Sequence, residues 1–334
     1  MAAKTHSAYS ARLERVGTQT DILGESPVWN EPDESLYWVD IRRPAIRRLH
    51  FASSRVDTWD MPELVGAIGF TTDGALLVAL ADHLALFDTE TGQFERVAQL
   101  PQRIPGHRFN DGRCDRQGRF WVGTMHNLTR APEGVLYRLG GVDTAIATNT
   151  AAGLLPLAPI LSDLCIPNSL AWSPDSRTMY FADSLLHTIF AYDFEPATGT
   201  MGARRVFATT APPGFPDGST VDAEGFLWNA EFNAGRVVRY APDGRIDRVI
   251  DLPVPRPTCC AFGGPNLDIL FVTTASQHMS DAERCALPLA GALLRLDVGV
   301  RGLPEPRCGL RAAAAPTTPT TPTLPFATAQ RSPP

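Results

Sequence analysis

Cysteine pairs, long apolar runs and an excess of positive charge are all missing from this chain of 334 residues. Its six cysteines form no CxxC pair and no regular framework, so we expect free, mostly buried thiols. The adjacent Cys259 and Cys260 would point to opposite faces of a strand, which disfavours a shared metal or redox site. With 30 basic and 36 acidic residues and no basic stripe, neither nucleic acid nor an anionic membrane is an expected partner.

Targeting segments and familiar catalytic signatures are missing as well. No segment approaches the roughly 18 to 20 apolar residues of a membrane span, and the polar start of the chain has no signal-peptide core. We therefore expect a cytoplasmic protein that acts on a small molecule. There is no GxSxG segment and no HExxH or HxH spacing, and no histidine accompanies Ser26, Ser169 or Ser219. Serine catalysis and a structural zinc site are both disfavoured.

One short apolar unit, by contrast, occurs six times. Most copies follow a turn signal such as Asp73-Gly74, and a second short strand comes downstream. The six cores are Leu36-Tyr37-Trp38-Val39-Asp40, Leu76-Leu77-Val78-Ala79-Leu80, Phe120-Trp121-Val122-Gly123-Thr124, Met179-Tyr180-Phe181-Ala182-Asp183, Phe226-Leu227-Trp228-Asn229-Ala230 and Ile269-Leu270-Phe271-Val272-Thr273. They lie roughly 40 to 60 residues apart, the period of a four-stranded propeller blade. The pattern predicts an all-β, six-bladed β-propeller.

A single domain is expected, because a propeller can reach this size around one continuous core. We place the propeller at residues 11–310, with a flexible N-terminus at 1–10 and a disordered tail rich in Ala, Thr and Pro at 311–334. The stretch from Gly140 to Asp163 is interpreted as an insertion loop with short strands. A strand from the segment Ala11 to Leu23 would close the ring by joining the last blade.

Polar groups stand at the beginning of four units, where inner strands of a propeller converge on the channel mouth. They lie in the segments Gly24-Glu25-Ser26-Pro27, Arg108-Phe109-Asn110-Asp111-Gly112, Ile166-Pro167-Asn168-Ser169 and Phe215-Pro216-Asp217-Gly218. Glu25, Asn168 and Asp217 offer only oxygen donors, which hard divalent cations prefer. Pro216-Asp217-Gly218 and Asn110-Asp111-Gly112 are also ordinary turn sequences, but their position before a first strand favours a role in a site.

These segments, in this order, resemble the senescence marker protein/gluconolactonase/luciferin-regenerating enzyme family (regucalcin-like). The resemblance rests also on Phe120-Trp121-Val122-Gly123-Thr124-Met125 and Pro167-Asn168-Ser169-Leu170-Ala171-Trp172, and it runs from about Glu25 to Leu296. The late segments Cys260-Ala261-Phe262-Gly263-Gly264-Pro265 and Leu287-Pro288-Leu289-Ala290-Gly291-Ala292 are most similar to the bacterial sugar lactonases of that family.

The resemblance implies one catalytic divalent cation held by Glu25, Asn168 and Asp217, with Ca²⁺, Mg²⁺, Mn²⁺, Zn²⁺ and Fe²⁺ as candidates. It also implies that Arg108 and Asn110 line the substrate pocket. Relatives closer to the animal protein carry an acidic residue shortly after the Gly-Thr-Met segment, whereas this chain has His126-Asn127. We expect His126 and Asn127 to make the polar contacts at that place.

The expected function is metal-dependent hydrolysis of a sugar lactone, an arabinono-, xylono-, galactono- or gluconolactone, to the aldonic acid. Asp217 is the candidate general base, and Arg108 would hold the lactone and stabilise the developing oxyanion. An alternative for Arg108 is a structural salt bridge to Asp111 or Asp115. The alternative function is a non-catalytic calcium-binding propeller, and a broad esterase or phosphotriesterase side activity stays open.

Overall fold

The computed structural model describes residues 12–140 and 154–310 and contains six antiparallel sheets of four strands each. The first three sheets consist of β2 (Gly24–Asn30), β3 (Ser35–Asp40), β4 (Ala45–His50), β5 (Val56–Asp60); β6 (Ala67–Phe70), β7 (Leu76–Ala79), β8 (His83–Phe87), β9 (Phe94–Gln99); and β10 (His107–Cys114), β11 (Phe120–His126), β12 (Gly134–Leu139), β13 (Leu157–Leu164).

The other three sheets follow in chain order, and the last of them takes its fourth strand from the beginning of the chain. They consist of β14 (Pro167–Trp172), β15 (Thr178–Asp183), β16 (Thr188–Glu195), β17 (Thr200–Thr209); β18 (Phe215–Val221), β19 (Leu227–Phe232), β20 (Arg236–Tyr240), β21 (Ile246–Asp251); and β22 (Pro257–Gly263), β23 (Ile269–Thr274), β24 (Leu293–Asp297), β1 (Arg12–Val16). The helices are short: η1 (Glu31–Asp33), η2 (Ser184–Leu186) and α1 (Asp281–Ala286).

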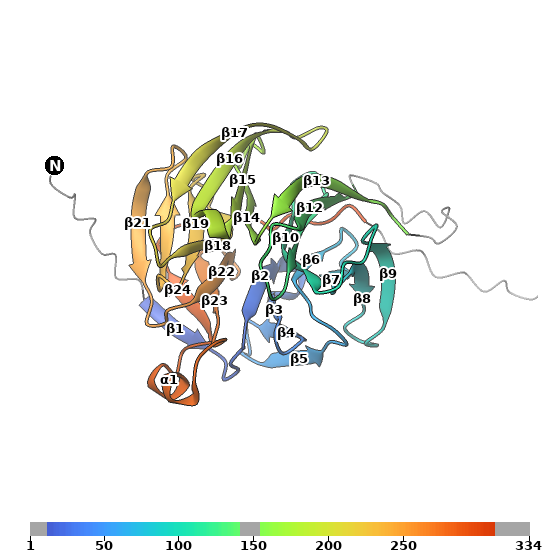
Figure 1. Ribbon diagram of the computed structural model, residues 1–334. Coiled ribbons are helices and arrows are strands. Elements are labelled where there is room, and N and C mark those ends of the chain that lie inside the picture. Colours follow the sequence, from blue (N-terminus) through green and yellow to red (C-terminus); the bar gives the residue numbers. More distant parts are fainter. Residues whose placement is uncertain (1–11, 141–153, 311–334) are drawn as a thin grey trace, which may run out of the picture.

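The first strands of the six sheets form a closed inner ring. β2 contacts β6, β6 contacts β10, and the series continues through β14, β18 and β22 back to β2. Figure 1 shows these strands toward the centre, with outer strands such as β5, β9, β17 and β21 at the periphery. The predicted six-bladed propeller is confirmed.

Two strand segments tie the ring together. β1 pairs antiparallel with β24, from Arg12 opposite Asp297 to Val16 opposite Leu293, so the N-terminal segment closes the last blade as the sequence indicated. Residues 299–310 then cross the end of the ring where the first strands finish. There the backbone N–H of Cys308 donates to the carbonyl oxygen of Phe70 at 2.7 Å, which ties the sixth blade to the second.

Buried aspartates fix the tryptophans of the second strands. The Asp115 carboxylate accepts hydrogen bonds from Trp121 Nε1 at 2.8 Å and from Arg119 Nε at 2.5 Å. In the fifth blade Asp222 accepts from Trp228 Nε1 at 2.9 Å. These bonds satisfy the indole N–H in the core and account for the aspartates that begin the turns before β11 and β19.

Part of the expected insertion belongs to a blade. Residues 157–164 form β13, the outer strand of the third sheet, while 141–153 lie outside the described residues, as do the expected flexible ends at 1–10 and 311–334. All six cysteines are free thiols, as predicted. Within the described ranges no helix has the length and apolar character needed to cross a membrane.

Candidate functional site

The inner strands that carry the predicted site residues share a local irregularity. The pairing register shifts between Glu25 and Val28 in β2, after Asn168 in β14, and between Pro216 and Ser219 in β18. A bulge of this kind re-aims side chains and is common next to active sites. Asp217 therefore lies in an irregular strand and not in a hairpin turn.

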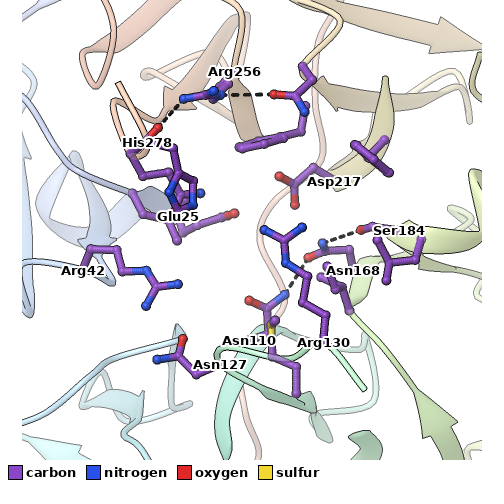
Figure 2. Close-up of a pocket in the computed structure, with 18 of the residues that line it drawn as sticks. Glu25, Arg42, Asn110, Asn127, Arg130, Asn168, Ser184, Asp217, Arg256 and His278 are labelled. Carbon is purple, nitrogen blue, oxygen red and sulfur yellow. Dashed lines mark hydrogen bonds between the residues drawn. The ribbon is translucent and has the colours of Figure 1, made fainter. Parts of the chain in front are cut away.

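A cavity opens at the end of the ring where the first strands begin, and most of the predicted residues line it (Figure 2). Those residues are Glu25, Arg108, Asn110, Asn127, Asn168 and Asp217, of which Figure 2 labels all but Arg108. They come from β2, β10, β14, β18 and the end of β11, so four different blades contribute.

His126 is the exception among the predicted residues. Its neighbours Met125 and Asn127 both line the cavity, and alternation along β11 turns His126 to the other side. There its Nδ1 accepts hydrogen bonds from the backbone N–H of Leu128 at 3.2 Å and of Thr129 at 3.0 Å. The expectation of a pocket contact from His126 is corrected: Asn127 alone reaches the cavity.

Hydrogen bonds fix the orientation of the Asn168 amide. The Ser184 hydroxyl donates to the carbonyl oxygen of Pro216 at 2.7 Å, so it can accept the hydrogen bond from Asn168 Nδ2 at 2.8 Å. The amide oxygen then lies on the cavity side, where Asn110 Nδ2 donates to it at 3.0 Å. A second lone pair of this oxygen stays available for a cation.

Arg108 belongs to the same network. Its Nη1 donates to Asn110 Oδ1 at 2.7 Å, and its Nε donates to Asn127 Oδ1 at 3.0 Å. Within residues 12–140 and 154–310 it forms no salt bridge to Asp111 or Asp115, so the structural alternative is not supported. Burial, followed by the charge of Arg42, lowers the pKa of Arg108 to about 10, which leaves it protonated at neutral pH.

Two buried carboxylates, those of Glu25 and Asp217, face the cavity. Burial and then the charge of Asp111 raise the pKa of Glu25 to about 8. Burial and then the charge of Glu25 raise the pKa of Asp217 well above its ordinary value. Neither residue forms an ion pair with any side chain in the described part of the chain. Buried carboxylates of this kind require compensation, and a divalent cation among oxygen donors would supply it. The donor set therefore fits the predicted cation.

Two further aspartates, Asp40 and Asp183, were not assigned from the sequence. Their carboxylates fix the backbone of the segments that lead into β2 and β14. Asp40, at the end of β3, accepts from the backbone N–H of Ile22 at 2.9 Å and of Leu23 at 3.1 Å, just before Glu25. Asp183, at the end of β15, binds the N–H groups of 165–166 in the same way, just before Asn168. The recurrence of Asp at the end of two repeated cores was the available signal.

Most residues of the cavity rim could not be assigned from the sequence. The additional polar lining residues are Arg42, Arg130, Ser184, Asn233, Arg256, Gln277 and His278. Nearly all of them lie in loops between strands. The repeated strand pattern does not predict where the side chains of such loops point. His278 lies in the loop after β23 and lines the cavity as well.

A second group of potential ligands lies in the second blade. Glu63, Asp82 and His83 have donor atoms within 4.8 Å of one another. Asp82 is already paired, with His83 Nδ1 at 2.9 Å and with Arg103 Nε at 3.1 Å. These contacts account for the proximity of Asp82 and His83.

Fold and site together define a six-bladed propeller whose central cavity brings together the oxygen donors of Glu25, Asn168 and Asp217. The family model described as the SMP-30/gluconolactonase/LRE-like region matches residues 23–276, and the chain belongs to this family. It is 36% identical to the 6-deoxy-6-sulfogluconolactonase of Pseudomonas putida, over 88% of this chain and 97% of the relative. It is 39% identical to the L-arabinolactonase of Azospirillum brasilense, over 86% of this chain and 92% of that relative.

Among solved structures, it resembles a calcium-binding protein, regucalcin, from Agrobacterium tumefaciens. The TM-score is 0.80 and the identity 33%, over 88% of this chain and 96% of the other. Fold and family thus agree with the resemblance inferred from the motifs.

Proposed function

We propose that this protein is a sugar lactonase that hydrolyses an aldonolactone to the aldonic acid with the help of a divalent cation. The observation that carries the proposal is the pair of unpaired buried carboxylates, Glu25 and Asp217, beside the fixed amide oxygen of Asn168. The Arg108–Asn110 pair lies at the same cavity. The two lactonases similar to this chain act on sugar lactones by name, which supports a carboxylic ester hydrolase.

Glu25, Asn168 and Asp217 are the residues that would hold the cation. Bound there, a divalent ion supplies Lewis acidity toward the lactone carbonyl and lowers the pKa of water. An all-oxygen set accommodates Ca²⁺, Mg²⁺ or Mn²⁺ readily and also accepts Zn²⁺ or Fe²⁺, so these residues do not select one ion among the five.

In the proposed reaction the oxygen of water bonds to the lactone carbonyl carbon, and the ring C–O bond breaks. Asp217 takes a proton from the water and returns one to the leaving ring oxygen, so the product is a hydroxy acid that ionises at neutral pH. Arg108, held by Asn110 and Asn127, presents its remaining N–H groups to the oxyanion.

A serine nucleophile has no support in the described chain. The Ser169 hydroxyl donates to the backbone oxygen of Asp217 at 2.7 Å, and the Ser26 hydroxyl accepts from the backbone N–H of Ile68 at 3.0 Å. Neither hydroxyl has a histidine partner, so no base is placed to activate it.

A calcium-binding scaffold is the second candidate, because the similar solved structure is named a calcium-binding protein. Cation storage alone would not need a buried arginine bonded to two asparagines at the edge of the same cavity. That arrangement favours the lactonase.

The test is acid release from a panel of arabinono-, xylono-, galactono- and gluconolactones, measured on chelated protein and after each divalent ion is returned. We expect chelated protein to match the spontaneous rate and at least one ion to restore turnover. Tight Ca²⁺ binding with no acceleration by any ion would favour the scaffold and contradict the lactonase.

A further inference from the structure

The cavity has a strongly cationic rim. Among the described residues, four arginines, Arg42, Arg108, Arg130 and Arg256, line it together with two carboxylates, those of Glu25 and Asp217. The whole chain is acidic, with a formal net charge of −6, so this is a local reversal of sign. A bound divalent cation would make the cavity more positive still. Such a field attracts anions and raises their local concentration.

The arginines differ in how they are held. Arg108 is committed to Asn110 and Asn127, and Arg256 donates its Nε to Asn233 Oδ1 at 3.1 Å. Arg42, after β3, and Arg130, after β11, form no side-chain hydrogen bond or ion pair within the described ranges. Figure 2 shows both around the same opening as Glu25 and Asp217.

Arg42 and Arg130 are also within electrostatic reach of each other. Burial lowers the pKa of Arg42, and the charge of Arg130 lowers it further. Both charges contribute to lowering the pKa of Arg108. Like charges placed together without a partner destabilise one another, and an anion bound between them would remove that cost.

We infer that this site takes a lactone that carries a second, anionic group, such as a sulfonate, phosphate or carboxylate, and that Arg42 and Arg130 bind that group. The inference rests on the proposed lactonase function and adds the substrate class. A neutral lactone offers Arg42 and Arg130 no negative charge to bind, and only its ionised product would be attracted by the positive cavity. A lactone with an anionic group is attracted by the same field already as the substrate.

The experiment compares kcat/KM for glucono-δ-lactone with the values for its 6-phospho and 6-sulfo analogues and for a glucarolactone, using the cation-loaded full chain. We expect at least one anionic lactone to exceed the neutral one about tenfold or more. Arg42→Gln and Arg130→Gln should each reduce this ratio about tenfold, mainly through KM. Arg43→Gln removes the same charge from an exposed neighbour that does not line the cavity, and it should keep the wild-type ratio.

A second readout separates the inference from the proposed function. Calorimetric binding of 6-phosphogluconate and of gluconate needs no turnover, and we expect the former to bind more tightly and to lose this advantage in Arg42→Gln. If lactones are hydrolysed but the neutral one is preferred, or if Arg42→Gln and Arg43→Gln behave alike, the inference is overturned and the lactonase stands. If no lactone is hydrolysed but 6-phosphogluconate binds through Arg42, the lactonase fails and the anion site stands.

Discussion

The side-chain amide of Asn110 donates from Nδ2 to Oδ1 of Asn168 at 3.0 Å, and this bond joins the two halves of the cavity. On one side Asn110 accepts from Arg108, and on the other Asn168 donates to Ser184. The residue proposed to hold the lactone and the residue proposed to hold the cation are therefore parts of one network. A substitution at the lactone end of the network should therefore change cation binding, and one at the cation end should change lactone binding.

Ser184→Ala tests the orientation of Asn168. The substitution removes the acceptor for Asn168 Nδ2, so the amide is free to turn and its oxygen is no longer held toward the cavity. We expect cation affinity to fall about 10- to 100-fold and the free energy of unfolding by about 1 kcal/mol. Calorimetric cation titration measures the first. Ser173→Ala, at a hairpin far from the cavity, is the control; equal cation affinity in both variants would refute the role of Ser184.

Asp183→Asn tests the two hydrogen bonds by which the Asp183 carboxylate fixes the backbone just before β14. An amide cannot accept hydrogen bonds at both of its heavy atoms, so one of the N–H groups at 165–166 loses its partner. We expect a loss of about 1 to 3 kcal/mol in the free energy of unfolding and weaker cation binding. Denaturant titration and calorimetry measure the two effects. The control is Asp193→Asn, an exposed surface pair with Arg205, which should stay within about 0.5 kcal/mol of wild type. If Asp183→Asn and Asp193→Asn have the same free energy of unfolding and the same cation affinity, the hydrogen bonds of Asp183 are dispensable.

The stability of the metal-free protein should depend on pH through Glu25. Its pKa rises from an ordinary 4.5 in the unfolded chain to about 8 in the fold, chiefly through burial. Between these values the fold retains a proton that the unfolded chain has lost. The contribution of Glu25 to the free energy of unfolding is therefore fully present below pH 4.5 and is lost as pH rises toward 8, by up to about 1.4 kcal/mol per pH unit.

Denaturant titrations of chelated protein at pH 5 to 8 measure this slope. Glu25→Gln should make it shallower, because the neutral amide has no proton to lose. A saturating cation should also oppose the fall, since it favours the ionised carboxylate. Identical slopes for the wild type and Glu25→Gln would contradict the assignment.

Ring closure by β1 should be essential for stability. Removal of residues 1–17 deletes the strand that pairs with β24 from Arg12 to Val16 and leaves β24 as an exposed edge. We expect a large fall in Tm and aggregation of the truncated protein. Removal of 1–11 keeps the strand and is the matched control, so it should retain a Tm close to that of the full chain. A 1–17 deletion that melts like the control would show that the closure contributes little.

The repeated pattern predicted much of the architecture because each blade is built from local hairpins with the same period. It also placed Glu25, Asn168 and Asp217 at one point of the repeat, since inner strands of a propeller share a common phase. That Asn127 lines the cavity and His126 does not depends on the register of β11, which the sequence does not specify. Arg42 and Arg130 lie in loops without periodic constraint, so only the folded chain shows that they meet at the cavity.

The most direct test of the account compares wild type and Asp217→Ala side by side, each chelated and then reconstituted with the most effective cation. Aldonolactone turnover and far-UV circular dichroism are recorded on the same samples. The account predicts cation-dependent turnover in wild type, and background hydrolysis with an intact β-sheet spectrum in Asp217→Ala. A folded Asp217→Ala protein with full turnover would contradict it.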